Sequence, residues 1–272
     1  MNTVSNTAYY CCGVRMEDAR QPRSICNDQF AQRFMDERAK RVFEPFRSEI
    51  MPNISNATRC RIIDDILRSE IKPGTTIISI GAGFDTRPYR LAGGTWVELD
   101  EAPLLAYKNE KLPMSECSNP LRRIAIDFSR EPLGEKLAGI GAEHPVIVVI
   151  EGVFMYLEPA AILANVHELR RLFPHHLLLC DLMNRRFFEK FSGSVHAKLV
   201  AAGGAFTARP IHPEEVFTQN GYLEIERIPM VRRALELGAF WYRLGIPDFL
   251  SRLLLKVFLK DLDGYAVYRF QV

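Results

Sequence analysis

Short apolar segments of β-strand character alternate with helical segments through the middle of the chain, and this alternation restricts the fold more than any other feature. Strands separated by helices form βαβ units, in which the strands pair in parallel. The segment Val146–Ile150 contains only Val and Ile, as expected of a central strand that is buried on both faces. The sequence therefore predicts an α/β fold. The five strands expected in this region are Thr76–Ile80, Thr95–Asp100, Arg122–Asp127, Val146–Ile150 and Leu177–Asp181.

Helical spacing of apolar residues indicates two helices beside these strands. The first is expected to begin after Asn53 or Ser55 and to end before Pro73-Gly74, which cannot continue a helix. The second, Pro159–Leu172, follows the fourth strand as a crossover helix. Two late strands are expected at Tyr222–Ile228 and Gly264–Val272.

The composition is that of an ordinary globular protein. Of 272 residues, 47% are hydrophobic and 25% are charged, which supplies the core of one large domain and excludes disorder and coiled coil. Thirty-five basic residues against 33 acidic ones leave a net charge of +2. Because there is no global positive field, we expect no nucleic-acid partner.

The cysteines and the N-terminal sequence indicate a reducing compartment. The six cysteines form no Cys-x-x-Cys pair, and no cluster of His, Cys and carboxylates has the spacing of metal ligands. We expect six free thiols, most of them packed, and no metal site. No signal peptide and no apolar run of membrane-spanning length is present. The sequence thus predicts a cytoplasmic protein without stable membrane insertion.

A glycine turn follows the first predicted strand. Gly81-Ala82-Gly83 comes directly after Ile80, and such a turn lets a ligand approach the backbone at the carboxyl end of a strand. A dinucleotide fingerprint would continue with a third glycine at position 86, where this chain has Thr86. A nicotinamide dinucleotide is therefore the less favoured ligand.

Acidic residues follow three successive strands. Asp100 ends the second predicted strand, Asp127 ends the third, and Glu151 follows the fourth. Because the carboxyl ends of parallel strands share one edge of the sheet, we expect these carboxylates along one crevice. Asp100 is positioned to accept from ribose hydroxyls. This arrangement suits a nucleoside with a positively charged sulfur better than a pyrophosphate.

Three motifs, in order, resemble the signature of the leucine carboxyl methyltransferase family. They are Ile80–Leu91, then Glu98-Leu99-Asp100 with Pro103 and Lys108, and Glu151–Leu157. The family includes C-terminal leucine methylases of protein phosphatases and tetracenomycin-type polyketide O-methyltransferases, and the resemblance extends over about residues 25–185. It implies a class I methyltransferase fold, a Rossmann-like sheet of order 3-2-1-4-5-7-6, with S-adenosyl-L-methionine (AdoMet) as cofactor.

The resemblance also implies roles for particular residues. Arg59 would pair with the carboxylate of AdoMet, and Gly81 would lie under its methionine portion. Asp100 would hold the ribose. The Asp127 side chain and the backbone of Phe128 would bracket the adenine. Glu151 would face the cofactor from the fourth strand. These six residues are the predicted cofactor-binding set: Arg59, Gly81, Asp100, Asp127, Phe128 and Glu151.

Other polar residues near these motifs allow two interpretations. Arg87 or Arg90 is either an anion receptor for a substrate or the partner of Asp85 in an ion pair that fixes the turn, and we favour the ion pair. Tyr156 is the predicted positioning residue at the mouth of the crevice, with packing as the alternative. Histidines such as His196 show no triad-like spacing.

The chain is expected to form one domain, residues 1–272, with two appendages. Residues 1–53 would form a helical cover and 54–228 the cofactor-binding core. Residues 229–263 would form an insertion before the last strand, 264–272. From Ile228 to Lys260 six basic and two acidic residues give a net charge of +4 among apolar residues. This insertion is interpreted as a substrate cap, with a homodimer interface, a membrane-surface helix or an ordinary amphipathic helix pair as alternatives.

We expect an AdoMet-dependent O-methyltransferase that forms methyl esters on a small anionic or aromatic metabolite. A carboxylate acceptor is ionised at neutral pH and needs no general base, whereas a phenol would benefit from one. The alternatives are carboxyl methylation of a protein or peptide C-terminus, a nicotinamide-dependent oxidoreductase, and a non-catalytic AdoMet-binding protein.

Overall fold

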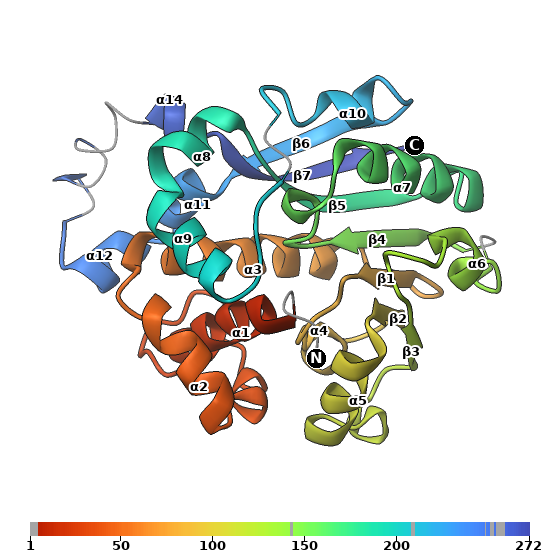
Figure 1. Ribbon diagram of the computed structural model, residues 1–272, viewed down its shortest axis with the longest axis horizontal. Coiled ribbons are helices and arrows are strands. Elements are labelled where there is room, and N and C mark those ends of the chain that lie inside the picture. Colours follow the sequence, from red (N-terminus) through yellow and green to blue (C-terminus); the bar gives the residue numbers. More distant parts are fainter. Residues whose placement is uncertain (1–4, 142–143, 208–209, 248, 251–252, 254–258) are drawn as a thin grey trace.

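A seven-stranded sheet forms the centre of the protein (Figure 1). The computed structural model describes residues 5–141, 144–207, 210–247, 249–250, 253 and 259–272. The strand order is β3-β2-β1-β4-β5-β7-β6, with β7 antiparallel to both neighbours, and this confirms the predicted class I topology. The strands are β1 (Thr76–Ile80), β2 (Thr95–Asp100), β3 (Leu121–Ala125), β4 (Val146–Ile150), β5 (Leu177–Met183), β6 (Leu223–Pro229) and β7 (Tyr265–Gln271).

The third strand ends earlier than predicted. We expected it to reach Asp127, but β3 ends at Ala125. The Asp127 carboxylate accepts hydrogen bonds from the backbone N–H and the hydroxyl of Ser129, and this local turn competes with the strand ladder. Asp127 therefore lies in a loop beyond the strand end.

Helices surround the sheet, and none of the described ones combines the length and apolar character of a membrane span. The α-helices are α1 (Ser5–Ala19), α2 (Glu37–Phe43), α3 (Ile50–Glu70), α4 (Arg87–Arg90), α5 (Ala102–Lys111), α6 (Leu133–Leu137), α7 (Pro159–Leu172), α8 (Arg185–Phe191), α9 (Gly193–Ala201), α10 (Glu215–Thr218), α11 (Met230–Glu236), α12 (Ala239–Leu244) and α14 (Leu259–Leu262). Short 3-10 helices are η1 (Ala31–Phe34), η2 (Glu44–Phe46), η3 (Met114–Glu116) and η4 (Phe154–Tyr156).

The first predicted helix is longer than its sequence signals suggested. α3 begins at Ile50 rather than after Asn53 or Ser55, and it ends at Glu70, before Pro73. Pro52 is compatible with the early start because the first turn of a helix needs no N–H partner. The second predicted helix, α7, has the predicted bounds.

Alternate side chains of the strands form two cores on opposite faces of the sheet. Ile77 of β1 and Val149 of β4 pack with α1 and α3. Ile78 and Val148 pack with α6 and α7 on the other face. All five residues of β4 are buried, which confirms that this strand is central. Figure 1 shows α1 and α2 on the side towards which the β4 arrow points.

The cysteines agree with the expectation of free thiols. All six lie in the described part of the chain and none forms a disulfide. Cys12, Cys26, Cys60 and Cys180 are buried, whereas Cys11 and Cys117 are partly exposed. Most of the thiols are therefore packed.

The described part of 229–263 packs beside α3. Helices α11 and α12 contact α3, and Val231 and Leu235 of α11 are buried in the same core as α3. Two of its arginines form ion pairs outside the insertion, Arg233 with Asp65 of α3 and Arg243 with Asp18 of α1. These contacts attach the insertion to the helical side of the molecule.

Truncation of a buried strand residue tests this core. Leu178 of β5 is fully buried, so Leu178→Ala is expected to lower the free energy of unfolding by about 2–5 kcal/mol through lost burial and a residual cavity. Leu223→Ala is the control, because Leu223 on the edge strand β6 is mostly exposed and should change stability by about 0.5 kcal/mol or less. Urea unfolding measures both variants, and equal effects would contradict the different burial assigned to the two side chains.

Candidate functional site

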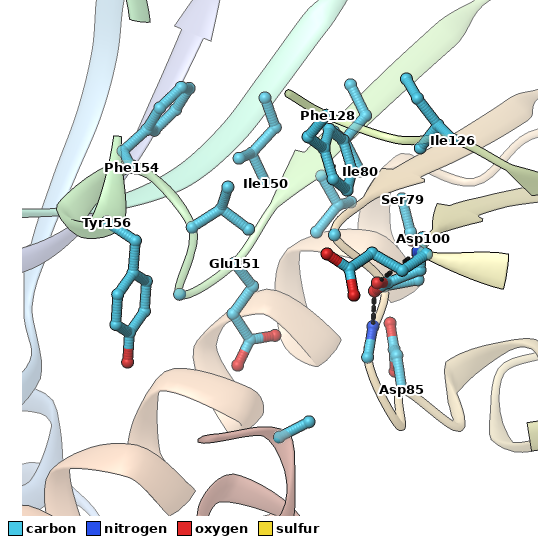
Figure 2. Close-up of a pocket in the computed structure, with 18 of the residues that line it drawn as sticks. Ser79, Ile80, Asp85, Asp100, Ile126, Phe128, Ile150, Glu151, Phe154 and Tyr156 are labelled. Carbon is cyan, nitrogen blue, oxygen red and sulfur yellow. Dashed lines mark hydrogen bonds between the residues drawn. The ribbon is translucent and has the colours of Figure 1, made fainter. Parts of the chain in front are cut away.

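A cavity of about 540 Å³ lies at the carboxyl edge of the sheet. Its wall includes the ends of β1, β2 and β4, the loops after them, and residues of α1, α3 and α7. Figure 2 shows the carboxylates of Asp85, Asp100 and Glu151 in one part of the wall and the apolar side chains of Ile80, Ile150 and Phe128 in another. The cavity thus has an acidic part and an apolar part.

The glycine turn after β1 brings the backbone to the wall of the cavity. Gly81 has φ +67°, and a Cβ on it would lie 2.5 Å from Cγ2 of Val153. The N–H groups of Gly81 and Ala82 both donate to the carbonyl of Leu99 at the end of β2. A side chain at position 81 would therefore be strained and would clash, so this position requires glycine.

Asp100 connects β2 to the glycine turn. One of its carboxylate oxygens accepts from the N–H of Gly83 at 2.6 Å and the other from the N–H of Glu101 at 2.8 Å (Figure 2). The residue is 7% exposed and lines the cavity, and burial raises the pKa of its carboxyl. The carboxylate is fixed by backbone donors, and its unused lone pairs remain acceptors for a ligand.

Asp127 and Phe128 lie where the apolar part of the cavity opens to solvent. Both line the cavity, and Phe128 is 41% exposed. The pKa of Asp127 is lowered by hydrogen bonds from the Ser129 side chain and backbone. Ile80 and Ile126 lie nearby in the wall (Figure 2). An exposed aromatic ring beside two buried isoleucines forms a surface suited to a flat apolar group.

Arg59 and Glu151 form an ion pair across the cavity wall. Nε of Arg59, on α3, donates to Oε1 of Glu151 at 2.9 Å. The other oxygen of Glu151 lies 2.7 Å from Nη1 of Arg87. Burial alone would raise the pKa of Glu151, but Arg87 and Arg59 outweigh it and lower this pKa to about 2. Glu151 is therefore ionised throughout the neutral range, although it lies in a mostly buried place.

Arg87 and Arg90 form ion pairs with other residues of the protein. Arg87 is 2% exposed and pairs with Asp85 at 3.0 Å and with Asp64 of α3 at 2.7 Å. Arg90 pairs with Asp64 at 2.5 Å. The favoured interpretation, an Asp85–Arg87 ion pair that fixes the turn, agrees with this geometry. Arg90 has Asp64 rather than Asp85 as its partner.

Tyr156 and His196 differ in their relation to the cavity. Tyr156 lines it from η4, and its ring packs edge-on against Phe206 with centroids 5.1 Å apart. Burial raises the pKa of Tyr156 above its usual value of 10.0. His196 accepts a hydrogen bond from the backbone N–H of Phe206. No histidine is among the described residues that line the cavity.

The sequence interpretation missed two groups of residues at this site. The first is the inner face of α1, where Thr7, Ala8, Cys11 and Arg15 line the cavity. The second lies behind Arg59, where Asp181 of β5 and Tyr265 of β7 contact its guanidinium. The near-helical spacing of the first group was available in the sequence. Asp181 ends the fifth predicted strand, as Asp100 ends the second, and this position at a strand end could have indicated that Asp181 belongs to the site.

The described residues of the insertion at 229–263 lie away from this cavity. None of them is part of the wall. Val231 and Leu235 are buried in the core beside α3, whereas Trp241 is exposed. The prediction of a substrate cap receives no support from these residues, and positions 248, 251–252 and 254–258 lie outside the described part. The helix that contributes to the wall from outside the core is α1, which belongs to the predicted cover segment.

The low pKa of Glu151 predicts how the stability of the fold changes at acid pH. A carboxyl whose pKa is about 2 in the folded protein and 4.5 ordinarily stabilises the fold fully above pH 4.5, and this contribution is lost as the pH falls towards 2. Glu151→Gln should therefore be less stable at pH 7, and its stability should fall less between these pH values.

Urea unfolding at a series of pH values measures this difference. Glu110→Gln, a change on the exposed surface of α5, serves as the control and should follow the wild type. An identical pH dependence for Glu151→Gln and the wild type would show that the Arg59 and Arg87 contacts do not hold the carboxylate ionised.

Solved structures share the fold. A DUF574 family protein from Streptomyces avermitilis aligns with a TM-score of 0.58 at 14% identity and covers 95% of this chain and 99% of its own. A geranyl diphosphate methyltransferase solved with S-adenosylmethionine (SAM) aligns with a TM-score of 0.51 at 11% identity, with 81% and 89% covered. At these identities the likeness concerns the fold alone.

Sequence comparison gives the family. A protein of Mycobacterium ulcerans named "Putative S-adenosyl-L-methionine-dependent methyltransferase" is 27% identical over 182 residues, which are 59% of this chain and 60% of that protein. The chain therefore spans about three fifths of the length of the curated relatives it matches. The profile of the leucine carboxyl methyltransferase family matches residues 11–169. The chain belongs to the leucine carboxyl methyltransferase family.

Proposed function

We propose that this protein is an AdoMet-dependent O-methyltransferase that forms methyl esters on the carboxylate of a small anionic or aromatic metabolite. The observation that carries the methyl-donor assignment is the cavity itself, where a glycine turn and the carboxylates of Asp100 and Glu151 lie beside an apolar surface at Phe128. Bound AdoMet supplies a methyl group already activated on a positively charged sulfur. Acidic side chains beside this cation stabilise it.

The residues of the cavity fit this cofactor by their chemistry. Asp100 is held by Gly83 and Glu101 and offers acceptors to ribose hydroxyls. The turn at Gly81 provides close backbone approach for the methionine portion. Phe128 and the Asp127 side chain flank the place assigned to the adenine. Glu151 and Arg59 form the polar end, where an ammonium and a carboxylate find partners of opposite charge.

The residues that line the cavity favour a carboxylate over a phenol as the methyl acceptor. Methyl transfer to an ionised carboxylate needs alignment more than proton transfer, whereas a phenol is helped by a base. No histidine lines the described part of the cavity, and the raised pKa of Tyr156 keeps its hydroxyl protonated at neutral pH. The acceptor is assigned to the end of the cavity formed by α1 and Tyr156. Tyr156 is its positioning residue.

Replacement of Asp100 tests the cofactor site. Asp100→Ala is expected to weaken AdoMet binding by at least about tenfold, since a hydrogen bond to a charged group contributes ~1.5–3 kcal/mol. Titration calorimetry with AdoMet measures the dissociation constant. Asp65→Ala, on α3 and away from the cavity wall, is the control and should leave it unchanged. An unaltered constant for Asp100→Ala would refute the ribose role, and tight NAD(H) binding in place of AdoMet would refute the cofactor assignment.

The product of methyl transfer tests the acceptor class. Incubation with methyl-labelled AdoMet and a cell extract is expected to label a small molecule, and mild base should release the label because esters hydrolyse where ethers and N-methyl groups do not. Chromatography before and after base treatment gives the result. Base-stable label would contradict ester formation. Label on a polypeptide would favour C-terminal carboxyl methylation, and no label in any fraction would favour a non-catalytic AdoMet-binding protein.

A further inference from the structure

The guanidinium of Arg59 is held by groups from four different elements. Nε donates to Glu151 after β4, and Nη1 lies 3.0 Å from Asp181 of β5 and 2.7 Å from the hydroxyl of Tyr265 of β7. Nη2 lies 3.6 Å from the sulfur of Cys11 of α1. Because guanidinium groups have five N–H donors in a fixed plane, these contacts set both the position and the orientation of the group.

Asp181 binds both the Arg59 guanidinium and the backbone of Gly152, although it is not part of the cavity wall. Its Oδ2 accepts from Arg59 and from Tyr265, and its Oδ1 accepts from the N–H of Gly152 at 2.6 Å. Gly152 follows Glu151 in the chain. A single carboxylate that is 1% exposed therefore fixes the arginine of α3 and the backbone beside Glu151 at the same time.

The hydroxyl of Tyr265 fixes the orientation of the Asp181 carboxylate relative to Arg59. It donates to Asp181 at 2.6 Å and accepts from Arg59 at 2.7 Å. The residue is 9% exposed, and Phe187 packs against its ring with centroids 5.5 Å apart.

Among the described residues, the remaining donor capacity of Arg59 lies on Nη2, whose partner is a sulfur rather than a carboxylate. Nη2 is therefore the donor that can pair with an incoming anion.

We propose that Asp181 and Tyr265 are positioning residues that fix Arg59 in the cavity wall, so that its Nη2 binds the carboxylate of the methyl donor. This inference rests on the proposed function. Asp181 and Tyr265 do not line the cavity, and they act on the cofactor only through Arg59. Their loss should therefore affect ligands that have an amino-acid carboxylate and spare ligands that lack it.

A pair of ligands and a conservative variant test this proposal. S-adenosylhomocysteine contains the amino-acid portion, whereas 5′-methylthioadenosine shares the nucleoside and thioether but has no carboxylate. Tyr265→Phe keeps the packed ring and removes one hydroxyl. By calorimetry it should weaken S-adenosylhomocysteine binding about three- to tenfold and change methylthioadenosine binding by less than about twofold.

Two further variants serve as comparisons. Tyr268→Phe is the matched control, since Tyr268 is on the same strand but in the core of the opposite face, with Arg227 over its ring, and it should leave both ligands unchanged. Arg59→Gln should itself lose affinity for S-adenosylhomocysteine only, and in this background Tyr265→Phe should have no additional effect. Asp181→Asn should show the same selective loss as Tyr265→Phe.

The outcomes separate this inference from the function on which it rests. Equal weakening of both ligands by Tyr265→Phe would show a general structural role and overturn the proposal, as would no change in either. Failure of the wild type to bind S-adenosylhomocysteine would refute the proposed function and, with it, the inference. Selective loss in Arg59→Gln without any loss in Tyr265→Phe would leave the function standing and refute the positioning role alone.

Discussion

The structure of the site depends on the buried guanidinium of Arg87. It contacts Asp64 of α3, Asp85 of the glycine turn and Glu151 after β4, so that one cation joins three segments that are far apart in the sequence. Breaking a buried ion pair by removing one partner leaves an uncompensated charge, whereas the intact pair contributes little net stability. The ion pairs of Arg87 therefore matter mainly because they fix the relative positions of these three segments. Its contacts hold the helix, the turn and the strand end beside one another.

A second set of ion pairs extends this arrangement to the rest of the cavity. Arg15 of α1 pairs with Asp28 and donates to the carbonyl of Phe84 in the turn, and Arg59 is held by Glu151 and Asp181. Glu151 is thus ionised and oriented before a ligand arrives. Preorganised charges need no rearrangement on binding, which favours a ligand with a fixed positive charge.

The charge distribution of the folded protein differs from the one that the linear sequence suggests. The sequence shows a basic apolar insertion before the last strand, which favoured an anionic acceptor near it. In the structure two of its arginines, Arg233 and Arg243, pair with Asp65 and Asp18, and the cavity lies elsewhere than its described residues. Among the described residues, the arginines that reach the cavity wall are Arg15, Arg59 and Arg87, which lie among acids in segments of ordinary composition.

The sequence by itself determined the strands of a parallel sheet and most of the residues at their ends, because apolar periodicity and glycine turns are local properties. The strand order followed from the resemblance of its motifs to the leucine carboxyl methyltransferase family. The sequence also placed Asp100, Glu151 and Gly81 at one edge, since parallel strands bring their carboxyl ends together. It could not show that α1 supplies a wall, that Asp127 lies beyond its strand, or that α11 and α12 of the insertion pack on α3. Nor could it show that Asp181 and Tyr265 contact Arg59, which is 122 and 206 positions away in the chain. These are contacts between distant segments, and only the packing of the whole chain decides which buried charges become partners.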